Sequence, residues 1–149
     1  KIAWIGDGCN VCQTYMQAAE IFDFELSIAT PAGYEPSEAF SQKYKKNINF
    51  FNNPMQACQE ADVVVTDVWT SMGQESEKKQ RETSFKGFQV DQLMMNQAKA
   101  DAVFMHCLPA YRGIEVSSQV IDGSQSVVWS EAENRLHAQK SLLLYLIED

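Results

Sequence analysis

Polar and reactive side chains follow three apolar segments of the sequence, at the points where those segments end. Asp67 ends one segment and precedes a turn that contains hydroxyl groups and a glycine, so its carboxylate could bind an ammonium group. Cys107 follows another segment, where a thiol can be partly exposed and reactive. Asn10 closes the sequence G-D-G-C-N after the first segment and could present its amide to a ligand. These three sequences are candidate walls of a binding site.

Each of these features also has a purely structural interpretation. Asp67 resembles a helix cap before the charged stretch 75–82, which is typical of a solvent-exposed helix with charge pairs three and four residues apart. The glycine- and Asx-rich sequence 6–10 is typical of a tight turn between a strand and a helix. Cys107 could be a buried cysteine that behaves as a small hydrophobic residue.

Two further patterns point to cofactors, and both are weak. The sequence 6–11 would need glycine in place of Val11 to complete a dinucleotide-binding loop. Cys9 and Cys12 form a C-x-x-C at an expected helix start, where redox pairs occur, but Cys58 and Cys107 each stand alone and complete no zinc-binding set. We therefore predict no cofactor and no bound metal.

The elements that would position these residues alternate along the chain. Five short, continuously apolar runs are separated by amphipathic stretches, which indicates βαβ units. Runs without polar alternation are typical of strands covered on both faces, so we predict an α/β fold with a doubly wound parallel sheet. The predicted strands are 2–5, 26–29, 48–51, 63–66 and 103–105.

Two helix starts are predicted from capping residues. Asn53 before Pro54 predicts a helix that ends near Glu60. Ser130 with Glu133 forms a capping box that predicts the start of a terminal helix reaching about Ile147. The last part of that helix is too rich in leucine for one face, so we expect its surface to contact something outside this domain.

Composition excludes several classes of protein. The 149 residues carry 12 basic and 20 acidic side chains, a net charge of −8, which disfavours binding to nucleic acid or anionic membranes. The longest apolar run, 142–147, is too short to cross a bilayer. We expect one domain over 1–149, in a cytoplasmic protein, and because the chain opens directly on a strand we expect it to be part of a longer polypeptide.

Ordered motifs over nearly the whole chain resemble the second, amino-acid-binding domain of the ornithine carbamoyltransferases. These motifs are WIGDGCN, ATPAGYEP, DVWTSMGQE, HCLPAYRGIEV and SEAENRLHAQKS. The resemblance implies the strand order 3-2-1-4-5. It also implies transfer of a carbamoyl group from carbamoyl phosphate to the δ-amine of ornithine, giving citrulline and phosphate.

Site residues are implied by the same resemblance. The α-amino and α-carboxylate groups of ornithine would be held by Asn10, Asp67, Ser71 and Met72. Carbamoyl phosphate would contact Cys107, Leu108 and Arg135. We further hypothesise that Cys107, as a thiolate, favours the neutral amine needed for attack.

The resemblance also has limits. The family's paired asparagines are replaced by Cys9 and Asn10, and Tyr111 stands where histidine is common. The phosphate-binding S-T-R-T and H-P-x-Q segments of the family's N-terminal domain are absent, so this chain alone is expected to be inactive, and the parent to be a homotrimer. Arginine synthesis and carbamoyl phosphate breakdown both stay open as its role.

Rival functions remain. Aspartate carbamoyltransferases would carry H-P-L-P where this chain has H-C-L-P, and their substrate would need cations where Asp67 stands. Putrescine carbamoyltransferases share H-C-L-P, but their substrate has no carboxylate for the turn at 71–73 to receive. A catalytically silent amino-acid-binding module and a nicotinamide-dependent oxidoreductase are the alternatives from other classes.

Overall fold

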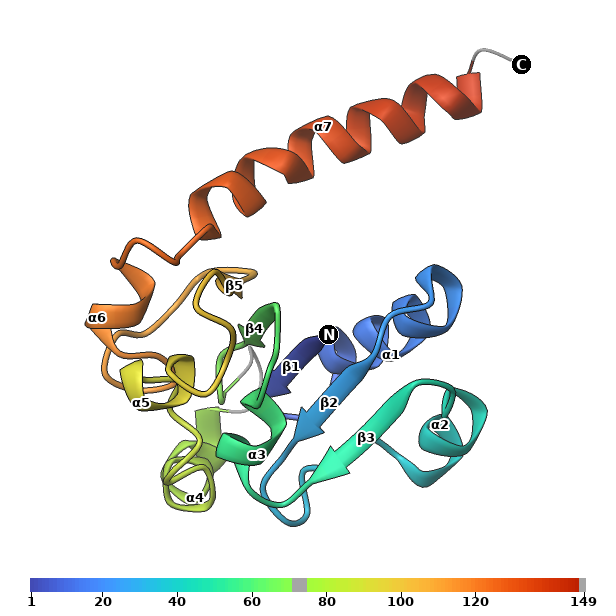
Figure 1. Cartoon of the computed structure of the whole chain (residues 1–149). Helices are drawn as coiled ribbons and strands as arrows, with labels where there is room; N and C mark the ends of the chain where they lie inside the picture. Colours follow the sequence, from blue (N-terminus) through green and yellow to red (C-terminus); the bar gives the residue numbers. More distant parts are fainter. Residues whose placement is uncertain (71–74, 148–149) are drawn as a thin grey trace.

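A five-stranded sheet with helices on both sides forms the centre of the computed structural model, which describes residues 1–70 and 75–147 (Figure 1). All neighbouring strands pair in parallel, in the order β3-β2-β1-β4-β5. The doubly wound fold and the strand order predicted above are therefore confirmed. The strands are β1 (Ile2–Ile5), β2 (Leu26–Ala29), β3 (Ile48–Phe51), β4 (Val63–Thr66) and β5 (Val103–His106).

Four strands have the predicted bounds, and β5 is one residue longer than predicted because His106 still pairs with Thr66. The helices between and after the strands are short except for two. They are α1 (Asn10–Phe22), α2 (Glu38–Lys43), α3 (Pro54–Cys58), the 3-10 turn η1 (Glu75–Glu77), α4 (Lys78–Ser84), α5 (Gln92–Met95), α6 (Ser118–Ile121) and α7 (Val128–Ile147).

Strands β1, β2 and β4 bury both faces, as their continuous apolar sequences predict, whereas the edge strand β3 leaves Asn49 and Phe50 exposed. On one face Trp4, Leu26 and Ile28 pack against Cys12 and Met16 of α1. On the other face, alternate strand residues pack against α3, α5, α6 and the first residue of α7. This second core is made of Ala3, Ile5, Val64 and Phe104 from the strands together with Ala57, Met94, Met95, Val120 and Val128 from the helices.

The start of α3 is confirmed, and its predicted end is not. The Asn53 side chain accepts a hydrogen bond from the Met55 amide at 3.0 Å, and Pro54 occupies the first turn. The helix ends at Cys58 rather than near Glu60, because Gln59 leaves the helical conformation and Glu60 adopts a positive φ of 55°.

The predicted start of α7 is wrong. The helix begins at Val128, so Ser130 lies inside the first turn and cannot cap it. The chain turns earlier because the Val127 amide donates to the Phe104 carbonyl at 3.0 Å and Val128 is buried in the core. Beyond this first turn α7 extends away from the sheet (Figure 1).

Most of α7 is exposed. Its apolar side chains in the second half are 47% to 75% exposed, and they are Leu142, Leu143, Leu144, Tyr145, Leu146 and Ile147. Within the described residues, no helix is both long and apolar enough to cross a membrane.

Candidate functional site

The carboxyl ends of β1 and β4 lie next to each other in the middle of the sheet. β1 pairs with β2 on one side and with β4 on the other, so the direction of winding reverses between β1 and β4. In open α/β sheets this reversal leaves a crevice in which ligands bind. The loop after β1 leads to Asn10, and β4 leads directly to Asp67.

Gly8 fixes the path of the loop after β1. Its amide donates to the Tyr34 carbonyl at 2.8 Å, and a Cβ at this position would lie 2.3 Å from the Pro36 nitrogen. Only glycine allows such close approach of two backbone segments. The loop delivers Asn10 to the first position of α1, where the residue is exposed.

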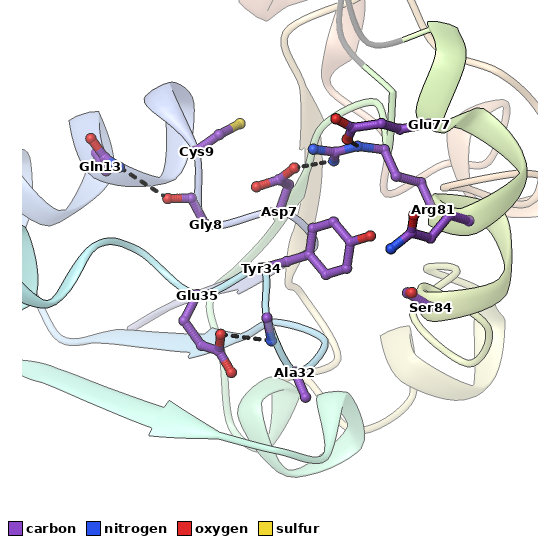
Figure 2. Close-up of a pocket in the computed structure, with 12 residues that line it drawn as sticks. Asp7, Gly8, Cys9, Gln13, Ala32, Tyr34, Glu35, Glu77, Arg81 and Ser84 are labelled. Carbon is purple, nitrogen blue, oxygen red and sulfur yellow. Dashed lines mark hydrogen bonds and ion pairs between the residues drawn. The ribbon is translucent and has the colours of Figure 1, made fainter.

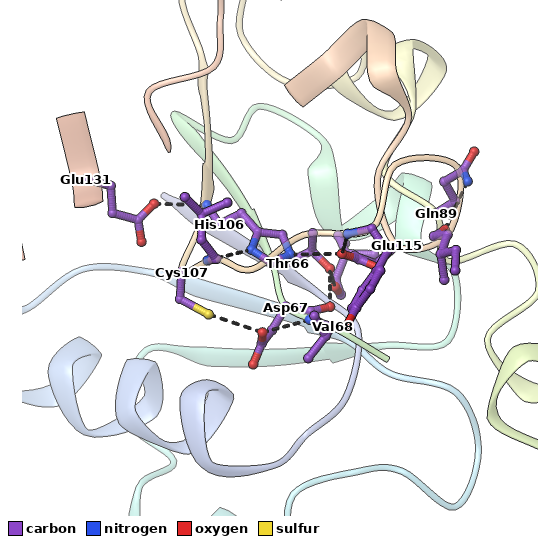
Figure 3. Close-up of polar contacts among 12 residues, drawn as sticks. Thr66, Asp67, Val68, Gln89, His106, Cys107, Glu115 and Glu131 are labelled. Atoms are coloured by element: carbon purple, nitrogen blue, oxygen red, sulfur yellow. Dashed lines mark hydrogen bonds and ion pairs between the residues drawn. The ribbon is translucent and has the colours of Figure 1, made fainter. Parts of the chain in front are cut away.

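Asp67 is buried at the end of β4 with 7% of its surface exposed. Its Oδ1 atom accepts a hydrogen bond from the Val68 amide at 2.7 Å and another from the Cys107 thiol at 3.1 Å (Figure 3). Among residues 1–70 and 75–147, Oδ2 accepts no hydrogen bond from a side chain or backbone amide. A buried carboxylate oxygen that accepts no such hydrogen bond can receive an ammonium group.

The Cys107 thiol points toward Asp67, although the residue as a whole is exposed (Figure 3). Burial of the sulfur, followed by the hydrogen bond to Asp67 and its negative charge, raises the pKa of Cys107 to about 12. The neighbouring carboxylate favours the protonated thiol in this arrangement, and the hypothesis that Cys107 acts as a thiolate stays a prediction.

His106 shapes the turn that carries Cys107 and Leu108. The Leu108 amide donates to Nδ1 of His106 at 2.9 Å, so Nδ1 carries no proton and Nε2 must carry it. Nε2 in turn lies 3.2 Å from Oε1 of Glu115, which is fully buried and also accepts the Tyr111 amide at 2.6 Å. These bonds hold Leu108 at a positive φ of 55°.

Glu115 and Glu131 both hold the end of β5, although no motif in the sequence assigns them a role. A carboxylate oxygen of Glu131 on α7 accepts the His106 amide at 2.9 Å. Burial raises the pKa of Glu131. Acidic residues after an H-C-L-P sequence give no local signal, because their partners depend on how α7 and the loop at 111–116 fold back.

Asp67, His106 and Cys107 also bring three potential metal-ligand atoms within 4.8 Å of one another. Both ring nitrogens of His106 already make hydrogen bonds, and the Cys107 thiol is protonated and donates to Asp67. The chemistry of this donor set fits a hydrogen-bonded network better than a cation site, because a metal would need a thiolate and a free ring nitrogen.

The C-x-x-C sequence lies at the start of α1, as predicted, without the chemistry of a redox pair. Burial and then the charges of Asp7 and Asp67 raise the pKa of Cys9 to about 11. Burial also raises the pKa of Cys12, and both cysteines are free thiols. Reactive cysteines at helix starts have lowered pKa values, whereas the pKa values of these two are raised.

Arg81 is a buried residue that the sequence analysis placed on a solvent-exposed face. Only 6% of its surface is exposed, and its guanidinium pairs with Asp7 and Glu77 (Figure 2). The expected pattern of charge pairs four residues apart is present in Lys78–Glu82 and Glu77–Arg81. Asp7, which lies across the fold, compensates for the charge of the buried Arg81. No local pattern in the sequence could reveal this partner.

A cavity of about 570 Å³ lies beside this pair, between the loops after β1 and β2 and helix α4 (Figure 2). Asp7, Tyr34, Glu35, Glu77 and Arg81 are among its lining residues, whereas Asn10, Asp67 and Cys107 are not. The cavity therefore adjoins the crevice and is not the predicted site.

The structure brings some of the predicted site residues together. Asp67, Cys107 and Leu108 lie at adjacent strand ends, and Asn10 follows the loop whose Cys9 thiol is influenced by the charge of Asp67. Arg135 is exposed on α7 and, within the described residues, makes no ion pair or hydrogen bond with them. Ser71 and Met72 lie outside the described residues.

The fold and this crevice define a doubly wound α/β domain with a polar site at the carboxyl ends of β1, β4 and β5. Residues 1–146 match the family described as "Aspartate/ornithine carbamoyltransferase, Asp/Orn binding domain". The chain belongs to this family.

Individual relatives agree with this assignment. The chain is 62% identical over 146 residues to an ornithine carbamoyltransferase of Ruthia magnifica, covering 98% of this chain and 49% of the relative. An ornithine carbamoyltransferase of Nitrosococcus oceani is 59% identical, and the match covers 98% of this chain and 48% of the relative. The chain thus spans about half the length of the curated relatives it matches.

Solved structures show the same fold. The ornithine carbamoyltransferase of Burkholderia thailandensis superposes with a TM-score of 0.88 at 46% identity, over 98% of this chain and 47% of that one. The anabolic ornithine carbamoyltransferase of Campylobacter jejuni gives a TM-score of 0.90 at 39% identity, over 98% of this chain and 50% of that one.

Proposed function

We propose that this chain is the ornithine-binding half of an ornithine carbamoyltransferase. The observation that carries the proposal is the buried Asp67 carboxylate, which bonds to the Cys107 thiol at the crevice between β1 and β4. The names of the relatives supply the reaction, in which the δ-amine of ornithine attacks the carbamoyl carbon. A new C–N bond forms, the C–O bond to phosphate breaks, and the proton that the amine nitrogen loses leaves with the phosphate.

Ornithine would be held at its α-carbon end. Asp67 pairs with the α-ammonium through Oδ2, while Oδ1 stays bonded to Val68 and Cys107. The Asn10 amide, with Ser71 and Met72, receives the α-carboxylate. This leaves the side-chain amine of ornithine free to extend toward the turn after β5.

The turn after β5 would hold the carbamoyl group. Leu108 offers its backbone carbonyl, because its amide is already bonded to His106. Cys107 acts as a protonated thiol whose hydrogen points at Asp67, so its sulfur can accept a hydrogen bond from the neutral δ-amine. Arg135 would orient the carbamoyl oxygen from α7.

The active enzyme would need a second, carbamoyl-phosphate-binding domain N-terminal to this chain. Relatives about twice as long and the exposed apolar residues of α7 both support this arrangement. The trimeric state and the carbamoyl phosphate partner follow from the resemblance, the cytoplasmic location follows from the composition, and all three stay predictions.

Replacement of Asp67 tests the proposal in the parent polypeptide that contains this chain. With Asp67→Asn we expect the KM for ornithine to rise by at least about tenfold, because a charge-assisted bond to the ammonium is lost. Asp122→Asn is the matched control, since Asp122 is an exposed carboxylate paired with Arg112 outside the crevice. Equal kinetics for the two variants would contradict the assignment of Asp67.

Replacement of Cys107 tests its own role separately. We expect Cys107→Ser to lower turnover and to change its pH profile, because the thiol lies between Asp67 and the reacting amine. Unchanged turnover with an unchanged profile would remove Cys107 from the mechanism. Turnover of putrescine in preference to ornithine would instead favour the putrescine enzymes.

A further inference from the structure

Arg81 is the single buried residue of α4 (Lys78–Ser84). Its side chain is 7% exposed, whereas its helix neighbours Lys79, Gln80 and Glu82 are exposed. Arginine is almost never buried without a partner, so its surroundings must compensate for the charge.

The guanidinium joins three separate segments. Its Nη1 atom donates to the Asp7 carboxylate and to the Trp69 carbonyl, the latter at 2.9 Å. Its Nε atom donates to Glu77 at 3.1 Å, and its central carbon lies 4.9 Å from the centre of the Tyr34 ring. Figure 2 shows Asp7 and Glu77 converging on Arg81 above the Tyr34 ring.

Two of these segments carry the proposed ornithine ligands. Asp7 stands three residues before Asn10 in the loop after β1, and Trp69 stands two residues after Asp67. β1 and β4 are paired as far as Trp4 and Val65, and the Thr66 hydroxyl then donates to the Ile5 carbonyl at 2.5 Å. Asp7 and Trp69 lie beyond this last contact between the two strand ends. Arg81 supplies a bond across the crevice at that level.

The Asp7 side of this bridge is rigid. The Asp7 carbonyl accepts the Trp4 indole N–H at 3.0 Å, and the neighbouring Gly8 is confined against Pro36.

We propose that Arg81 and Asp7 are a positioning pair that sets the separation of Asn10 and Asp67, and thereby the affinity for ornithine. This inference rests on the proposed function. We assign Arg81 no contact with substrate, because its side chain is buried and its Nε and Nη1 atoms donate to Glu77, Asp7 and Trp69. It acts through the two segments that it joins.

The test uses the parent polypeptide, with the KM values for ornithine and carbamoyl phosphate measured separately. Arg81→Lys keeps the charge but cannot reproduce the planar set of donors, and Asp7→Asn removes the charge of the partner. We expect either variant to raise the ornithine KM roughly tenfold and to leave the carbamoyl phosphate KM within about twofold. Lys78→Gln is the control, since Lys78 is an exposed residue of the same helix.

A double variant separates geometry from folding. Asp7→Asn with Arg81→Gln leaves no unpaired buried charge, so its melting temperature should exceed that of Arg81→Gln alone. We expect its ornithine KM to stay high, because an amide pair is too short to bridge the same segments.

Three results would overturn the inference. They are a wild-type ornithine KM in a folded variant, equal rises in both KM values, and loss of folding in every variant, which would make the pair purely structural. If instead the unmodified parent forms no citrulline, the proposed function fails before any variant is compared.

Discussion

At the residue scale, the same carboxylate controls two groups of the candidate site. Asp67 accepts the Cys107 thiol hydrogen and also contributes its charge to raising the pKa of Cys9 to about 11. The position of Asp67 and Cys107 at strand ends is predictable from the sequence, because polar residues after apolar runs mark the ligand-binding edge of such sheets. The hydrogen bond between them and its effect on the thiol depend on the strand order, so these two features are not predictable from the sequence.

The raised pKa of Cys107 predicts slow alkylation. We expect iodoacetamide to modify Cys107 at pH 8.5 on the order of a hundredfold more slowly in the folded chain than in urea, because only the thiolate reacts. Mass spectrometry of the Cys107 peptide measures both rates. Equal rates would show that the folded thiol has an ordinary pKa.

The same shift predicts how stability depends on pH. A raised folded-state pKa means that the native state favours the protonated thiol. This contribution is complete below pH 9, near the usual pKa, and is lost as the pH rises toward about 12.

Arg81 shows what the sequence alone could not reveal at this scale. Glu77 and Lys78 give a local pattern of exposed charge pairs, and that pattern is present. The partner that compensates for the charge of the buried Arg81 is Asp7, which lies 74 positions away in the sequence.

At the element scale, contacts to the sheet set where helices begin. Short apolar runs predict all five strands. Burial on both faces explains the continuous runs of β1, β2 and β4, although not that of the edge strand β3, which exposes Asn49 and Phe50. The start of α7 is not predictable in this way. Val127 pairs with Phe104 and Val128 enters the core, and these tertiary contacts start the helix before the capping box at Ser130.

A pair of serine variants tests this account of helix starts. Ser117 accepts the Val120 amide at 3.3 Å and caps α6, so Ser117→Ala should cost about 1 kcal/mol of stability. Ser130 lies within α7, so Ser130→Ala should be neutral or slightly stabilising. Thermal unfolding measures both variants, and we expect the melting temperature of Ser117→Ala to fall by roughly 2–4 °C. A larger loss for Ser130→Ala would restore the predicted cap.

At the scale of the whole molecule, α7 links the site to a surface that the domain leaves exposed. Its first turn carries Val128 into the core and Glu131 onto His106, whereas its second half exposes six consecutive large apolar residues. A helix that is anchored at one end and apolar at the other fits a contact with another domain. We infer that the proposed N-terminal domain covers this end.

The most direct test is citrulline formation from ornithine and carbamoyl phosphate, compared between this 149-residue chain and the parent polypeptide extended upstream of Lys1. We predict activity in the longer polypeptide and none in the isolated chain, because each half would hold one substrate. A longer polypeptide that binds ornithine but forms no citrulline would contradict the catalytic account and favour a silent amino-acid-binding module.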